Sequence, residues 1–229
     1  MNQTTYRIIQ WLITLLLPFF LGFAFITFVI SPAYPTWAYA QESFPPDRFG
    51  FSQEQRLELA LVAVDYLQRP EPAAETIYLL EEQIEPNQGT PLYNEEEIGH
   101  MIDVKIVTDA IRTSAWVLGV LLVAGFGFLL YGPKSRLFAY RGLRNGGILG
   151  TIILLGIALF IGSGWDTFFV LFHELLFADG TWTFPLSDSL IRLFPEKFWF
   201  DIGVIMSGGT LLLQMISGAV GWVLVRRSA

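Results

Sequence analysis

The sequence predicts an all-α integral membrane protein, with four transmembrane helices and a small helical cap on the extracytoplasmic side. Three observations predict this class: the chain has long uncharged apolar runs, its basic and acidic residues lie in different segments, and it lacks the alternation typical of strands. Of the 229 residues, 53% are hydrophobic and 15% are charged, whereas soluble domains carry about 25% charged residues. We therefore interpret residues 1–229 as a single membrane domain.

Four apolar runs are long enough, or nearly long enough, to cross a bilayer. A transmembrane helix needs about 20 apolar residues, and a shorter run requires extension into its flanking residues. The first and last runs reach this length, and the two middle runs are shorter but equally uncharged. The predicted spans are residues 8–30, 115–131, 147–162 and 204–225.

The distribution of charge predicts how the chain is oriented in the membrane. The two termini and the connection 132–146 contain seven of the 14 basic residues and no acid, whereas the connections 31–114 and 163–203 contain all 21 acids. Basic residues in short loops favour the cytoplasmic side. We therefore expect both termini and 132–146 in the cytoplasm, and 31–114 and 163–203 in the extracytoplasmic cap. A signal peptide cleaved near Ala40 is the rival interpretation of the first span, although its apolar run is unusually long for one.

Local signals predict where helices begin and end within the cap. Asn94, followed three residues later by Glu97, has the spacing of a capping box at the start of a helix. Lys105 and Asp109, four residues apart on that helix, are expected to form a solvent-exposed ion pair. Gly162, Ser163 and Gly164 lie at the end of the third span and are expected to break it. The aromatic-rich stretch that follows is typical of the membrane–water interface.

The two histidines of the chain, His100 and His173, both fall in the predicted extracytoplasmic segments. An unperturbed histidine accepts and releases protons near neutral pH, which suits general acid–base catalysis. Asp103 lies three residues after His100 on the same helix face, where a carboxylate can orient an imidazole. If residues 94–131 formed one straight helix, His100 would stand about 22 Å beyond the start of the second span. We therefore expect that helix to bend, or the cap to fold down, if the histidines are to meet.

The composition excludes several other kinds of functional site and argues against others. The absence of cysteine excludes disulfides, thiolate metal sites and a cysteine nucleophile. A net charge of −7 argues against nucleic acid as a partner. A zinc site is conceivable, but no ligand-spacing motif supports one, so we expect neither a metal nor another cofactor. The residues considered for zinc are His100, Asp103, His173 and Glu174.

Two blocks of the sequence resemble the signatures of a known family. The first block is LYNEEEIGHMIDVK at residues 92–105, ahead of the second span. The second begins with FHELLF at 172–177 and continues through Asp179 and Trp182 to LIRLFPE at 190–196. In the order and spacing of these blocks and in the number of spans, nearly the whole chain resembles the bacterial lipoprotein intramolecular transacylases.

This resemblance implies an enzyme of the bacterial cytoplasmic membrane, with its active site on the extracytoplasmic side. Such an enzyme transfers the sn-2 acyl chain of a diacylglyceryl-modified cysteine to the α-amino group of the same lipoprotein, leaving its lyso form. The bilayer and diacylglyceryl lipoproteins would be its partners. The two catalytic histidines of the family map onto His100 and His173, with Asp103 and Glu174 as candidates to support or orient them. The aromatic substrate pocket maps onto Phe172, Phe177, Trp182 and Phe194.

Two other functions remain open from the residues themselves. One is a membrane-interface lipid hydrolase, or an acyltransferase that acts on another lipid substrate. The other is a non-catalytic membrane scaffold whose cap binds a partner. Analysis of lipoprotein N-termini separates the first function from these two, and a phospholipid turnover assay then separates these two from each other.

Overall fold

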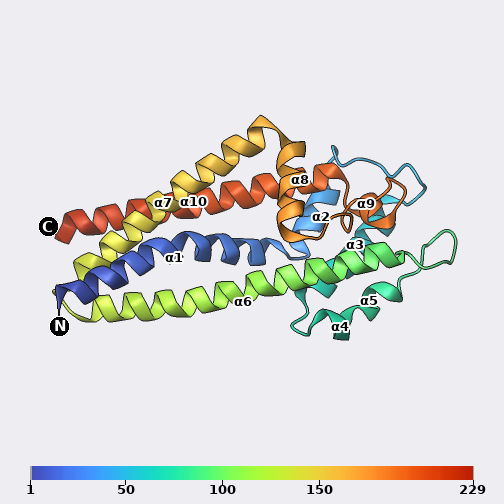
Figure 1. The fold of residues 1–229 in the computed structure, drawn as a ribbon. Helices are drawn as coiled ribbons and strands as arrows, with labels where there is room; N and C mark the ends of the chain where they lie inside the picture. Colours follow the sequence, from blue (N-terminus) through green and yellow to red (C-terminus); the bar gives the residue numbers. More distant parts are fainter. Residues whose placement is uncertain (1, 229) are drawn as a thin grey trace. The chain divides into compact units, whose positions relative to one another are not determined.

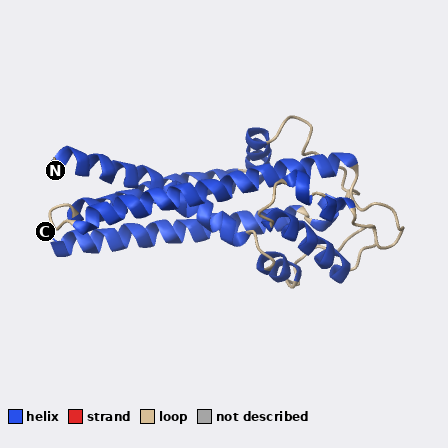
Figure 2. Ribbon diagram, turned by 90° about the horizontal axis from the view of Figure 1, so that it is seen from below, coloured by secondary structure: helices blue, strands red, loops and turns tan. Residues whose placement is uncertain are grey.

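Helices make up most of the chain. The computed structural model describes residues 2–228, and within that range it contains no strand, apart from one isolated bridge between Ile84 and Pro91 (Figures 1 and 2). In chain order the helices are α1 (Gln3–Val29), α2 (Ala33–Tyr39), α3 (Gln53–Gln68), α4 (Ala73–Thr76), α5 (Tyr78–Glu81), α6 (Glu95–Tyr131), α7 (Arg136–Ser163), α8 (Trp165–Leu176), α9 (Ser189–Leu193) and α10 (Glu196–Ser228).

Four of these helices, α1, α6, α7 and α10, are long and apolar enough to cross a membrane. This agrees with the four spans predicted from the sequence and confirms the predicted fold class. The helices extend beyond the predicted spans, and α6 extends furthest because it already begins at Glu95. The uncharged part of α6 starts only after Arg112. We therefore retain 115–131 as its predicted membrane-spanning segment and treat residues 95–112 as lying outside it.

The chain forms two compact units, and each is described separately here. The first, which we call the apolar unit, consists of Met1–Ile26, Ile111–Ser163 and Ile205–Ala229. The second, which we call the histidine unit, consists of Thr27–Ala110 and Gly164–Val204. The predicted cap segments cover nearly the same residues as the histidine unit.

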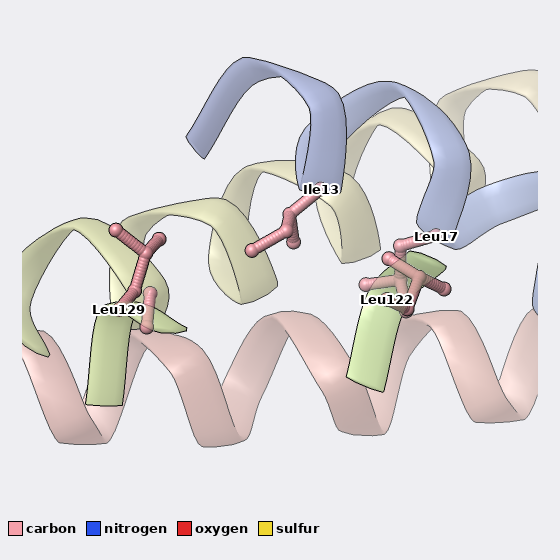
Figure 3. Close-up of a cluster of buried hydrophobic side chains, with 5 residues drawn as sticks. Ile13, Leu17, Leu122 and Leu129 are labelled. Carbon is pink, nitrogen blue, oxygen red and sulfur yellow. The ribbon is translucent and has the colours of Figure 1, made fainter. Parts of the chain in front are cut away.

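Aliphatic side chains from three helices form a buried cluster in the apolar unit. Ile13 and Leu17 of α1 lie in this cluster together with Leu122 and Leu129 of α6 (Figure 3). Ala139 of α7 completes it. In a bilayer, such packing stabilises the helices through van der Waals contact, because lipid tails are as apolar as the side chains.

The close approach of α7 and α10 depends on glycine. A Cβ atom on Gly147 would overlap the backbone of Gly218 and would lie 2.6 Å from the carbonyl oxygen of Gln214. A Cβ atom on Gly221 would overlap the backbone of Arg144. Small residues let transmembrane backbones approach closely, so these glycines set the distance between the two helices.

In the histidine unit, the start of α6 has the predicted capping box. Asn94 Oδ1 accepts a hydrogen bond from Glu97 N at 2.9 Å, and Glu97 Oε2 accepts one from Asn94 N at 2.9 Å. The Glu97 side chain is buried, and its Oε1 also accepts a hydrogen bond from Leu190 N at 2.7 Å. The first turn of α6 is therefore tied to α9, and His100 follows one turn later.

The predicted ion pair of Lys105 forms, but the prediction that it is solvent-exposed is wrong. Lys105 Nζ donates to the two carboxylate oxygens of Asp109 at 2.7 and 2.9 Å, and its side chain is 0% exposed. It also donates to the carbonyl oxygen of Arg69 at 2.8 Å. Because Arg69 follows the last residue of α3, the end of α3 covers the ammonium group, and the sequence spacing gave no sign of this long-range contact.

The two histidines were expected to come together only if the helix that carries His100 bends or the cap folds down. Helix α6 is continuous from Glu95 to Tyr131 and remains helical where the bend was expected. Helix α7 continues through Gly162 to Ser163, so the predicted break falls at Gly164 alone, and α8 then begins as a separate helix. Helix α8 belongs to the histidine unit and carries His173.

Candidate active site

Five aromatic rings contact the two imidazoles, and we call them the aromatic cage. They are Phe169, Phe172, Phe177, Trp182 and Phe184. The Phe177 ring contacts both histidines, with its centroid 5.0 Å from that of His100 and 5.6 Å from that of His173. The histidines on α6 and α8 therefore share one apolar enclosure.

The cage rings come from two kinds of backbone. Phe169 and Phe172 lie on α8 with His173, and their ring centroids are 4.0 and 5.4 Å from that of His173. The other three rings belong to the non-helical segment 177–188 between α8 and α9. From this segment, Trp182 lies 5.0 Å from His173, and Phe184 lies 5.4 Å from His100, between ring centroids.

The tautomer of His173 follows from one hydrogen bond. Its Nδ1 lies 2.7 Å from the carbonyl oxygen of Phe169, one helical turn earlier. Because a carbonyl oxygen only accepts hydrogen bonds, Nδ1 carries the proton and Nε2 of the neutral ring has a free lone pair. Burial lowers the pKa of His173, and the hydrogen bond to Phe169 opposes this effect in part. The ring is therefore an uncharged base near neutral pH.

His100 is also held uncharged. Burial lowers the pKa of His100 from 6.5 to about 4, and the nearby His173 lowers it further as a secondary cause. Its Nδ1 is buried and has no hydrogen-bond partner within residues 2–228. Two uncharged imidazoles in one apolar enclosure can exchange protons with a bound substrate, because the low-dielectric surroundings disfavour lasting charge.

The remaining candidate residues are placed differently from one another. Phe172, Phe177 and Trp182 are in the cage, whereas the buried Phe194 packs on Phe198 and Trp199, with ring centroids 5.1 and 6.1 Å away. Glu174 is exposed on α8. Asp103 is half-buried and does not bond Nδ1 of His100, since that nitrogen has no partner.

Sequence reasoning missed one feature of the site itself and one that anchors a neighbouring helix. Phe169 supplies a backbone carbonyl oxygen, which no side-chain pattern reveals. Arg192 was noted only as part of a signature block, yet its guanidinium group donates to Asp47 Oδ2 at 3.0 Å and lies 3.4 Å from the ring centroid of Phe51. Both charged side chains are nearly buried, so this pair ties α9 to the chain that precedes α3. An aspartate distant in sequence offers no local signal for such a pair.

Of the residues considered for zinc, only His100 and His173 come together. Within residues 2–228, no three or more His, Asp or Glu side chains are close enough to one another to hold a metal ion. The four residues considered for zinc therefore do not assemble into a zinc site in the part of the chain that the structure describes.

Fold and site together define an integral membrane protein whose uncharged histidines lie in one aromatic enclosure. The family model described as lipoprotein intramolecular transacylase Lit matches residues 8–199. The chain belongs to this family of membrane acyltransferases, which act in lipoprotein processing, and the resemblance seen in its two signature blocks is thereby confirmed.

Known proteins similar to this chain include one curated sequence and several solved structures. An uncharacterized protein of Aquifex aeolicus is 29% identical over 191 residues, which cover 83% of this chain and 79% of that protein. The lipoprotein intramolecular transacylase Lit from Bacillus cereus superposes with a TM-score of 0.64 at 21% identity, covering 99% of this chain and 97% of the other. A variant of it with one histidine replaced gives a TM-score of 0.58, also at 21% identity, over 99% of this chain and 92% of the other. At this identity, the likeness establishes the shared fold.

Proposed function

We propose that this acyltransferase transfers the sn-2 acyl chain of a diacylglyceryl-modified N-terminal cysteine to the α-amino group of that same cysteine. His100 and His173 act together as the proton-transfer unit. The observation that carries the proposal is the ring of Phe177, which contacts both imidazoles. The only two histidines of the chain thus share one enclosure, as a reaction with two proton transfers requires.

The reaction needs no nucleophile from the protein. The substrate's amine nitrogen attacks the carbonyl carbon of its own ester, so a carbon–nitrogen bond forms and the bond from that carbon to the glycerol oxygen breaks. The proton lost by nitrogen ends on the glycerol oxygen. All atoms of the substrate are retained in the product, so the reaction consumes neither water nor a cofactor.

The state of each ring suggests its role. His173 is the base, because its Nδ1–H is engaged by Phe169 and its Nε2 lone pair is free. His100 is the relay, because an uncharged imidazole can take a proton on one nitrogen and release one from the other. Its pKa of about 4 makes its protonated form a ready donor to the glycerol oxygen.

Confinement supplies the rest of the rate enhancement. The amine and the ester belong to one molecule but lie several bonds apart, so the protein must hold them together. Positioning of this kind is worth up to about 7–11 kcal/mol of the barrier. The aromatic cage, which contacts both imidazoles, is the proposed surface for this positioning.

Incubation of the purified protein with a synthetic diacylglyceryl lipopeptide tests the proposal. Mass spectrometry should show a product of unchanged mass whose fragments carry one acyl chain on the amine. Release of free fatty acid from phospholipid, with the lipopeptide unchanged, would instead establish a lipid hydrolase. No turnover of either substrate would favour a scaffold.

The proposed substrate also requires a particular orientation in the membrane. We place both termini and 132–146 in the cytoplasm and the histidine unit on the extracytoplasmic side of the bacterial cytoplasmic membrane. Support comes from the charge asymmetry, since 132–146 is basic and free of acids whereas the histidine unit is rich in them.

A further inference from the structure

Three buried polar atoms of the histidine unit have no hydrogen-bond partner within the described chain: Tyr93 Oη, His100 Nδ1 and Trp182 Nε1. Buried polar groups are rarely left unpaired, so each such atom needs an explanation. Two of the three belong to the candidate active site.

Trp182 Nε1 differs from the other two because an indole nitrogen only donates. A hydroxyl group or a neutral imidazole can act as donor or acceptor, whereas this N–H requires an acceptor. The ring of Trp182 lies 5.0 Å from that of His173, between centroids. In the folded protein, the N–H of Trp182 is therefore shielded from water beside His173, the proposed base.

The proposed reaction creates the acceptor that this donor lacks. When the amine attacks the ester, the carbonyl oxygen becomes negatively charged, and acyl-transfer sites stabilise this oxyanion with preorganised donors. His173 is occupied in taking the proton from the amine, and His100 in returning it to the glycerol oxygen. The oxyanion therefore needs a third group.

We propose that the indole N–H of Trp182 donates a hydrogen bond to the ester carbonyl oxygen as it becomes the oxyanion, which makes Trp182 a catalytic residue. This inference rests on the proposed transacylation. The indole keeps its proton throughout. As the intermediate collapses, the oxygen re-forms its double bond to carbon, the glycerol oxygen leaves, and the hydrogen bond weakens.

Substrate must part the cage to reach this N–H, which is shielded from solvent in the structure. Trp182 lies in the non-helical segment 177–188, where Thr181 N and Oγ1 bond the carbonyl oxygen of Ala178 at 3.2 and 2.9 Å. Gly180 turns the chain with a φ of 82°. A loop held by such local bonds moves at lower cost than α6 or α8, so a lipid can displace these rings while the histidine helices stay in place.

Two replacements of Trp182 test whether the N–H itself is needed. Trp182→Phe removes the N–H and part of the ring, whereas benzothienylalanine at this position keeps a bicyclic ring and replaces N–H by sulfur. We expect both to lower kcat for the diacylglyceryl lipopeptide by about 10²–10³-fold, the usual cost of losing one oxyanion donor. KM should change little, because the bond forms only in the transition state.

Trp37→Phe is the matched control, because Trp37 is 46% exposed on α2 and contacts Tyr34. It should keep wild-type kcat. If the benzothienylalanine protein also keeps wild-type kcat, the N–H has no catalytic role, even when Trp182→Phe is inactive or unfolded. If the wild-type protein makes no lyso-form product, the proposed function itself fails, which is a different outcome from an active enzyme indifferent to this N–H.

Discussion

His100 and His173 differ in what fixes their rings, although both are half-buried. The Nδ1 of His173 is bonded to the Phe169 carbonyl oxygen, so its tautomer is set before substrate arrives. The Nδ1 of His100 has no partner, and Phe177 and Phe184 hold this ring by packing. The proposed relay requires a base of fixed tautomer and a second ring that can carry its proton on either nitrogen.

The first prediction concerns removal of the pair. We expect His100→Gln, His173→Gln and the double variant each to lower transacylation by about 10²–10⁴-fold. The three losses should be similar in size, because residues that act as a unit are not additive. Asp103→Asn should be milder, since Asp103 does not bond Nδ1 of His100. Mass spectrometry of the lipopeptide product measures all four, and wild-type turnover in either single variant would refute the two-histidine mechanism.

A second prediction follows from the pKa of His100, which burial lowers from 6.5 to about 4. Between these values the unfolded chain binds a proton here that the folded protein does not bind. The contribution to stability is complete above pH 6.5 and is lost as the pH falls toward 4. The unfolding temperature should therefore drop in this window, and it should drop less for His100→Gln. Identical drops, followed by tryptophan fluorescence in detergent, would mean that His100 is not held uncharged.

The sequence predicted the roles of residues that interact with others nearby in the chain. It did not predict roles that depend on contacts between segments distant in the sequence. Asn94 and Glu97 form a capping box three residues apart, and a local pattern was enough to find it. Lys105 and Asp109 pair as their spacing indicates, yet the end of α3 buries the lysine. Phe177 was expected in the substrate pocket, but only the fold reveals that it contacts both histidines.

At the scale of helices, close packing of α7 on α10 leads to a third prediction. Gly147→Ala should destabilise the folded protein by about 1–3 kcal/mol, because the added methyl group would overlap the Gly218 backbone. Gly156→Ala, on the same helix, is the matched control, because a Cβ there meets no atom within 4 Å. Its stability should be unchanged or slightly higher, as alanine favours helix. Equal effects in urea unfolding of the two detergent-solubilised variants would contradict this account.

The elements themselves were predicted to different extents. The apolar runs predicted the four long helices, and the glycines at the end of the third run predicted the break after α7. Both signals are local properties of the chain. The capping box predicted that residues 95–112 are helical, but the apolar signal covered only 115–131, because charged residues add nothing to hydropathy; the structure shows that the two parts form one helix. The way in which the histidines come together was not predicted: α6 is helical throughout, and a separate helix, α8, carries His173 into the enclosure shared with His100.

For the molecule as a whole, the proposed orientation is testable because the chain contains no cysteine. Gln88 and Lys134 are both exposed, so cysteine at either position is open to a reagent. We expect a membrane-impermeant maleimide to label Gln88→Cys in intact cells and Lys134→Cys only after permeabilisation. The reverse pattern would overturn the orientation, and with it the extracytoplasmic active site.

The segment 177–188 contributes three of the five cage rings, whereas the histidines come from two helices that are distant in sequence. The two proposed proton-transfer residues and most of the enclosure around them are therefore encoded in separate places, although the segment also carries the proposed oxyanion donor, Trp182. Mutations confined to the codons for 177–188 can change the proposed surface for the acyl chains. They leave His100 and His173 unchanged. Members of this family can thus diverge by changes in that segment that keep Trp182.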